Sequence, residues 1–166
     1  MRTPSLFLFL SASTLLAATG CDVDTNPNIF VAAAIEDPYV DVQKKGDLGA
    51  DITGGFTLTL DLGARAADST EVSLEGFELV SKDEKTLIVS PLPLTAEGVT
   101  FPIVVEPGTK EAIEILIDYG NKLATKAEGD KLCSFGEVRF RGSISDSLQG
   151  TSEPIPPNLV DVTGCQ

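Results

Sequence analysis

The chain has 166 residues, of which 25 are acidic and 12 are basic, so its formal net charge at pH 7 is −13. A surface this acidic repels nucleic-acid phosphates and anionic lipid head groups, which argues against both as electrostatic partners. The sequence contains no histidine, and this removes the commonest general base, the Ser-His-Asp and Cys-His arrangements and most zinc sites.

The first twenty residues have the pattern of an export signal. Arg2 supplies a positive charge, and a largely apolar run extends from Leu6 to Ala18. That run has the length of a signal-peptide core and is shorter than the ~20 apolar residues that a membrane-spanning helix needs. We therefore expect residues 1–20 to be a signal peptide that is removed from the mature protein.

Small residues lead up to a cysteine in the segment Ala18-Thr19-Gly20-Cys21. This segment resembles the lipobox of bacterial lipoproteins, although Ala18 stands where that family usually has leucine. The resemblance implies a diacylglyceryl thioether on Cys21, cleavage before it, and often acylation of the new amino group. Two or more acyl chains, at about 0.8 kcal/mol per buried CH₂, would hold the protein on a membrane.

Two questions about this segment stay open. An ordinary secretory signal, cut at small residues such as Ser11-Ala12-Ser13, is the alternative to a lipobox. Asp22 directly follows the cysteine, and in enterobacterial lipoproteins an aspartate there is associated with retention at the inner membrane. Because that rule differs among lineages, the sequence leaves the inner or outer membrane undetermined.

The cysteine count favours lipidation of Cys21. An odd number of cysteines in an exported protein needs an explanation, and lipid on Cys21 leaves Cys133 and Cys165 as a pair. Export places that pair in an oxidising compartment, so we expect a disulfide. Closing a loop of about 33 residues corresponds to roughly 3–4 kcal/mol in the loop-entropy estimate. The alternative is a redox or metal-binding pair, but the C-x-x-C spacing is missing.

Residues 21–28 are polar and are expected to form a lipidated tether. Asp22, Asp24 and Asn26 fall at the alternate spacing of a calcium loop, and oxygen ligands suit Ca²⁺. However, Pro27 stands where the EF-hand pattern requires glycine. We interpret the segment as a hydrated tether without a cofactor and keep the calcium site as the alternative.

From residue 29 onward, apolar and polar residues alternate with period two in segments bounded by Gly, Pro, Asp and Ser. This is the pattern of half-buried β-strands. Strands are expected near residues 29–35, 39–42, 56–62, 72–79, 87–89, 99–105, 113–119, 138–144 and 159–162.

One of these strands changes phase in its middle. Val72 and Leu74 alternate in one phase, whereas Phe77 and Leu79 continue in the other. One extra residue at Glu75-Gly76 explains the offset, and glycine is the residue that a bulge tolerates. The pattern therefore predicts a β-bulge.

The remaining segments are expected to be turns and loops. Glu106-Pro107-Gly108 has proline and glycine where a type II turn needs them. Residues 44–55 are rich in Gly and Asp, and residues 124–130 are expected to be a polar loop with at most one helical turn. Three prolines between residues 152 and 158 argue against a central strand there.

About seven to nine short strands without a convincing amphipathic helix predict an all-β fold. We expect an antiparallel immunoglobulin-like β-sandwich over residues 29–166. The strand, Glu-Pro-Gly turn and second strand around residues 105–118 resemble bacterial immunoglobulin-like modules. The Cys…Trp…Cys core of antibody domains is missing, because the chain has no tryptophan.

Two groups of charged residues were weighed as sites. Paired carboxylates at Asp83-Glu84, or at Glu111 and Glu114, would suit glycosidase-type acid–base chemistry across a cleft, but acids in turns and on strand faces are usually solvated. Arg139 and Arg141 share one strand face. An anion site is the functional interpretation, and we expect instead that they pair with carboxylates of neighbouring strands.

The sequence therefore predicts a lipid-anchored, non-catalytic binding or structural module of the bacterial cell envelope. Its expected partners are a membrane, through lipid on Cys21, and an unidentified envelope protein, and neither enzymatic activity nor nucleic-acid binding is expected. A calcium-stabilised surface adhesin is the first alternative, and a carboxylate-based hydrolase is the second.

Overall fold

The computed structural model describes residues 26–166, and most of them lie in β-strands. The strands are β1 (Ala32–Lys44), β2 (Ala50–Leu62), β3 (Thr70–Ser81), β4 (Leu87–Val89), β5 (Leu94–Ala96), β6 (Ile103–Val105), β7 (Thr109–Ile117), β8 (Glu137–Asp146) and β9 (Ser152–Gly164). The described residues also contain a 3₁₀ turn, η1 (Gly46–Leu48), and one α-helix, α1 (Lys126–Phe135). The expected all-β class is confirmed.

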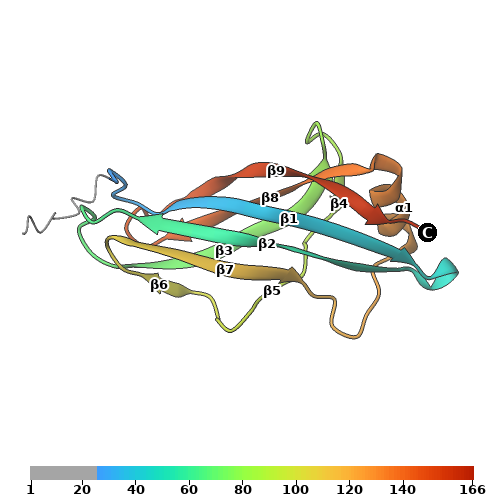
Figure 1. Cartoon of the computed structure of the whole chain (residues 1–166), viewed down its shortest axis with the longest axis horizontal. Coiled ribbons are helices and arrows are strands. Elements are labelled where there is room, and N and C mark those ends of the chain that lie inside the picture. The colour runs from blue at the N-terminus through green and yellow to red at the C-terminus, as the bar shows by residue number, and fades with distance from the viewer. Residues whose placement is uncertain (1–25) are drawn as a thin grey trace, which may run out of the picture.

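The nine strands form one sheet in the order β4-β3-β8-β9-β1-β2-β7-β5, with β6 pairing with β3. All pairs are antiparallel except β1 and β9, which run parallel, so the sheet is mixed where a purely antiparallel arrangement was expected. Figure 1 shows an elongated molecule with the β1–β2 turn and α1 at one end and the beginning of β1 at the other.

The sheet curls so that its two halves enclose the core. Phe56 on β2 stacks on Phe77 of β3, with ring centroids 5.5 Å apart, and meets the edge of Phe140 on β8 at 5.0 Å. These three rings and the alternating Leu58, Leu60 and Leu62 are buried, as the period-two pattern of this segment predicted. Burying each such side chain contributes about 1.5–3 kcal/mol, so this cluster is a main source of the curl.

The predicted bulge and turn are both confirmed. The register between β3 and β8 shifts between Glu75 and Glu78, and Gly76 has a φ of +60°. In the turn between β6 and β7, the amide of Thr109 donates to the carbonyl of Glu106 at 3.1 Å, and Gly108 has a φ of +76°. Both glycines therefore occupy positive-φ positions that other residues rarely adopt.

Residues 44–55 are not one loop, as their composition suggested. β2 already begins at Ala50, and Ile52 is buried in the core. Gly54 and Gly55, which suggested a loop, mark close backbone packing inside the strand. A Cβ on Gly55 would lie 2.4 Å from the carbonyl oxygen of Ile115 on the neighbouring β7.

The expectation of a loop with at most one helical turn over residues 124–130 was also wrong. Helix α1 begins with a capping box, in which the Glu128 amide donates to the Thr125 hydroxyl and the Thr125 amide donates to the Glu128 carboxylate. This T-x-x-E pattern is a helix-start signal that could have been read from the sequence. The helix contributes few residues to the core, chiefly Leu132, which explains its polar composition.

The proline-rich segment belongs to a strand, β9, although no strand was expected there, but over these residues β9 is not a central strand, as the prolines predicted. β9 pairs with β8 from Ser152 to Asp161 but with β1 only from Val162 to Gly164. The prolines therefore lie where β9 has a neighbour on one side alone, and the missing N–H groups cost no hydrogen bond on the unpaired side. The β8–β9 register also shifts opposite Pro156-Pro157, between Phe140 and Gly142 on β8.

The expected disulfide joins Cys133 in α1 to Cys165, directly after β9, with the two Cα atoms 5.5 Å apart. The amide of Cys165 also donates to the carbonyl of Val42 on β1 at 2.7 Å. The helix, the end of β9 and the end of β1 are thereby fastened together at the end of the molecule that carries the C-terminus in Figure 1.

The close contact between α1 and β2 gives a stability prediction. A Cβ on Gly129 would lie 2.4 Å from the Cβ of Ala50. Gly→Ala normally stabilises a helix by about 1 kcal/mol, but here we expect Gly129→Ala to lower the free energy of unfolding by about 1–3 kcal/mol through overpacking. Denaturant unfolding of the full chain measures this change.

The control for this prediction is the double variant Ala50→Gly/Gly129→Ala, which restores the space and should recover part of the loss relative to Gly129→Ala. A Gly129→Ala protein as stable as the parent would contradict the packing described for this helix.

Candidate ligand groove

The predicted lipidation residue, Cys21, and two of the predicted calcium ligands, Asp22 and Asp24, lie outside the described residues. The third, Asn26, uses its side chain within the fold: its Nδ2 donates to the Asp61 carboxylate at 2.6 Å, and its Oδ1 accepts from the Asn28 amide at 3.0 Å. Within residues 26–166, no three His, Cys, Asp or Glu side chains are grouped so that they could hold a metal ion.

The clustered acids do not form the carboxylate pairs that acid–base catalysis across a cleft would need. Asp83 sits in the β3–β4 turn, where a hydrogen bond from the Ser81 hydroxyl at 2.6 Å lowers the pKa of its carboxyl. Glu111 and Glu114 lie three residues apart on β7 and therefore point to opposite faces. The structure instead brings Glu114 beside Glu97, whose hydrogen bond and negative charge raise the pKa of Glu114.

Both arginines of β8 have structural roles, but only one of them forms the expected ion pair with a neighbouring strand. Arg141 pairs with the Glu78 carboxylate on the neighbouring β3, which confirms the expected cross-strand ion pair. Arg139 donates instead to two backbone carbonyls, that of Lys82 at 2.9 Å and that of Pro157 at 3.0 Å. Both guanidinium groups hold neighbouring segments together.

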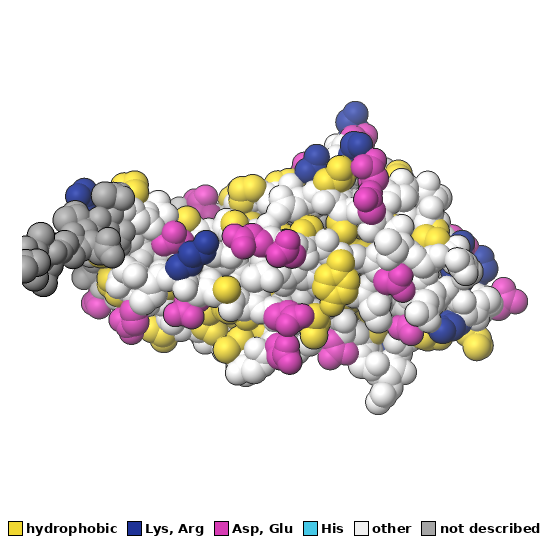
Figure 2. Space-filling model, viewed as in Figure 1, with side chains coloured by type: hydrophobic (Ala, Val, Ile, Leu, Met, Phe, Trp, Pro, Cys, Tyr) yellow, Lys and Arg dark blue, Asp and Glu magenta, His cyan; other side chains and the backbone are white. Residues whose placement is uncertain are grey.

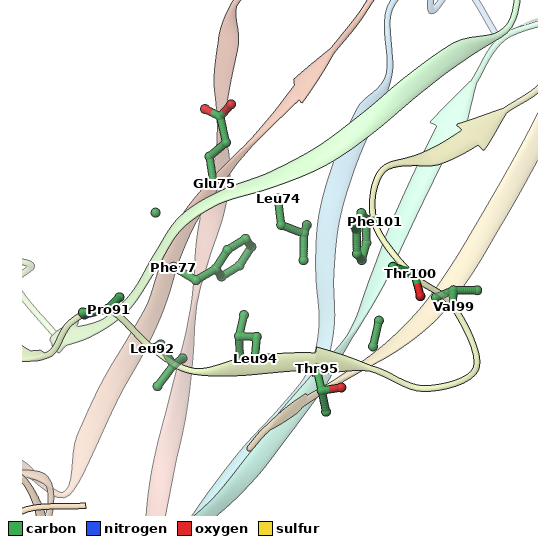
Figure 3. A pocket seen from close by; sticks show the side chains of 12 residues that line it. Leu74, Glu75, Phe77, Pro91, Leu92, Leu94, Thr95, Val99, Thr100 and Phe101 are labelled. Atoms are coloured by element: carbon green, nitrogen blue, oxygen red, sulfur yellow. The ribbon is translucent and has the colours of Figure 1, made fainter. Parts of the chain in front are cut away.

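An apolar groove lies between β3 and the segment that carries β5. Its volume is about 470 Å³. Figure 3 shows Leu74, Phe77 and Phe101 directed toward Leu94 across the groove. Phe77 and Leu92 are buried at its floor, whereas Leu74, Leu94 and Phe101 are only partly buried. These walls leave apolar surface open to solvent.

The groove exists because β3 lacks a continuous neighbour on this side. The ladder of β3 with β6 ends at Val72, and the ladder with β4 begins at Leu79. The bulge at Gly76 lies between these two ladders. One backbone hydrogen bond crosses the interval, from the Leu92 amide to the Phe77 carbonyl at 2.8 Å. The chain then runs on as β5, which faces β3 from the other side of the groove (Figure 3).

The opposite wall of the groove is a free strand edge. In the β5–β7 ladder, the Asp118 amide donates to the Pro93 carbonyl and the Glu97 amide donates to the Glu114 carbonyl, each at 2.9 Å. Because backbone groups alternate sides along an antiparallel strand, those of Leu94 and Ala96 point away from β7. Within the described residues, β5 pairs with no other strand.

The surroundings of the groove are acidic. Glu75 is the one charged residue among those that line it, and Glu97 follows directly after β5. Within residues 26–166, no ion pair involves Glu75, Glu97 or Glu114. Figure 2 shows acidic side chains spread along one face of the molecule, whereas basic side chains are fewer and mostly gather on the β3–β4 turn and near η1.

The sequence prediction missed β5 and with it the groove. Leu92, Leu94 and Ala96 do alternate with Pro93 and Thr95, so a period-two signal was present. The two prolines of the segment do not argue against this, because proline is compatible with an edge strand.

No protein-family model matches this chain, and neither a curated protein nor a solved structure matches it. None of the helices in the described part of the chain combines the length and the apolar character that crossing a membrane requires.

Two proline substitutions test whether the outer edge of β5 is free. Thr95 faces Leu116 in the ladder with β7, so Thr95→Pro removes a ladder hydrogen bond and should lower the free energy of unfolding by about 1–3 kcal/mol. Ala96→Pro removes an amide that has no partner among residues 26–166, so its loss should be clearly smaller. Denaturant unfolding of both full-length variants measures the difference, and equal losses would contradict the assigned edge.

Proposed function

We propose that this chain is a lipid-anchored binding module of the bacterial cell envelope, attached to its membrane through Cys21. The lipobox-like segment Ala18-Thr19-Gly20-Cys21 supports the anchor, and the odd cysteine is explained because Cys133 and Cys165 bond to each other. The apolar groove with its free strand edge supports a binding role, and we propose that this role is non-catalytic.

We also propose that the curled sheet is a variant of the immunoglobulin-like sandwich. In support of this, its two halves face each other across one core, and β9 leaves the half that contains β8 to pair with β1 in the other half. The parallel β1–β9 pair would then be a strand that switches between the two layers. Fold alone does not set function, so the binding role rests on the groove.

The contacts of Asn26 and Asn28 fix where a lipid on Cys21 would lie relative to the domain. Asn26 contacts Asp61 at the end of β2, and the Asn28 carbonyl accepts from the Gly63 amide at 3.0 Å. Cys21 precedes Asn26 by five residues, which span at most about 18 Å. A lipid on Cys21 would therefore hold this end of the molecule near the bilayer.

The remainder of the domain would then extend away from the membrane. β1 has 13 residues, and at about 3.3 Å per residue it spans about 40 Å. It leads to η1, α1 and the disulfide at the opposite end (Figure 1). The groove lies along the side between the two ends, where a protein in the envelope could reach it.

Replacing the proposed lipid attachment residue tests the anchor. Cys21→Ser removes the sulfur that is proposed to carry the thioether, so the variant should move from the membrane fraction to the soluble fraction after cell lysis. Labelled palmitate should enter the parent protein and not the variant.

The matched control is Cys133→Ser/Cys165→Ser, which lacks the disulfide but keeps Cys21 and should remain in the membrane fraction with its label. A Cys21→Ser protein that still sediments with membranes and keeps the parent's mass would refute the anchor.

A further inference from the structure

We propose that the groove between β3 and β5 binds an extended apolar peptide segment flanked by Lys or Arg, which pairs as an added strand with the free edge of β5. This inference deepens the proposed binding function and rests on it for its biological setting. The occupant would be a segment of another envelope protein.

The backbone of β5 sets the shape of the occupant. Leu94 and Ala96 together present two amides and two carbonyls to the groove side, spaced as in any strand edge, and neither residue pairs with a second strand of the described chain. An extended peptide satisfies such groups by β-augmentation, in which main-chain hydrogen bonds provide affinity. A small rigid ligand or a helix would leave them unpaired.

The walls of the groove set the side chains of the occupant. Leu94 faces Leu74, Phe77 and Phe101 across the groove, and no charged side chain is labelled between them in Figure 3. Ala96 also lines the groove. In an added strand, alternate side chains would point to this apolar interior and the others to solvent. The fitting core sequence is therefore a short alternation of apolar and polar residues.

The charges around the groove determine what flanks that core. Figure 3 shows the Glu75 side chain directed away from the apolar interior, so that it lies at the rim. Glu97 lies at the end of β5 beside Glu114, and its hydrogen bond and its negative charge both raise the pKa of the Glu114 carboxyl. A cationic side chain of the peptide beside these carboxylates would relieve this negative charge, whereas an acidic one would add to it.

The length of β5 limits the strength of the interaction. With three residues in the strand, only a few main-chain hydrogen bonds can form. Selectivity for basic flanks should therefore appear as a strong dependence on ionic strength, because the charges are exposed and are screened by salt.

The probe is a fluorescent synthetic peptide of about ten residues, with an alternating valine–threonine core between two pairs of lysines. Its binding to the full chain, purified from membranes in detergent, is followed by fluorescence anisotropy. A second peptide with glutamates in place of the lysines is the charge control. We expect saturable binding of the lysine peptide that weakens as salt is added, and at least about tenfold weaker binding of the glutamate peptide.

Variants of β5 locate the site. Ala96→Pro removes a groove-facing amide without removing a bond to β7, and should weaken binding about tenfold or more. Ala96→Val keeps the amide and only enlarges a side chain of the groove wall, so it should weaken binding clearly less than Ala96→Pro. Glu97→Gln should weaken binding of the lysine peptide a few-fold and reduce its salt dependence, because an exposed ion pair contributes only modestly to affinity.

Three results would overturn the inference. They are no saturable binding of the lysine peptide, equal binding of both peptides, or equal binding by the parent and Ala96→Pro. A concentration-dependent dimer of the full chain that Ala96→Pro dissociates would also overturn it, because the occupant of the edge would then be a second copy.

The experiments test the proposed anchor and the proposed peptide site independently. If Cys21→Ser stays on membranes while the lysine peptide still binds the groove, the proposed anchor is wrong and the peptide site stands. If Cys21→Ser is released but no peptide binds, the anchor stands and this inference is wrong.

Discussion

The structure depends on β9, which is the hydrogen-bonded link between the two halves of the sheet. It pairs antiparallel with β8 along most of its length and parallel with β1 over its last residues, Val162–Gly164. The Cys133–Cys165 disulfide and the bond from the Cys165 amide to the Val42 carbonyl hold this end in place. With β9 fixed to both neighbours, the half that carries Phe140 is held over the half that carries Phe56.

The opposite side of the molecule follows from this arrangement. β9 joins the two halves of the sheet on one side. On the other side, the halves are bounded by the outermost strands β4, β6 and β5. They are three residues each and do not form a continuous ladder, so β3 and β5 are joined by side-chain packing and by the bond from Leu92 to Phe77. The apolar groove is the part of this seam that remains open, and its edge groups are the ones available to a partner.

Local patterns predicted much of the fold. The alternation in β2, the bulge at Gly76 and the turn at Pro107-Gly108 each depend on a few neighbouring residues, so the sequence alone was sufficient. The proline-rich part of β9 was misjudged, because what a proline costs depends on which side of a strand is paired. The parallel β1–β9 pair joins residues about 120 positions apart, and nothing in the local pattern of either segment signals it. The groove was missed because the alternation in β5 was overlooked, and because only the curl of the sheet brings its two walls together.

The central claim is that β9 changes partner and holds β1 beside its final residues. The most direct measurement is the scalar coupling across the hydrogen bond from the Cys165 amide to the Val42 carbonyl, observed by triple-resonance NMR on the isotopically labelled full chain. The structure predicts a resolved coupling between these two groups and slow exchange of the Cys165 amide with solvent. No coupling, together with rapid exchange of that amide, would contradict the link between the two halves of the sheet.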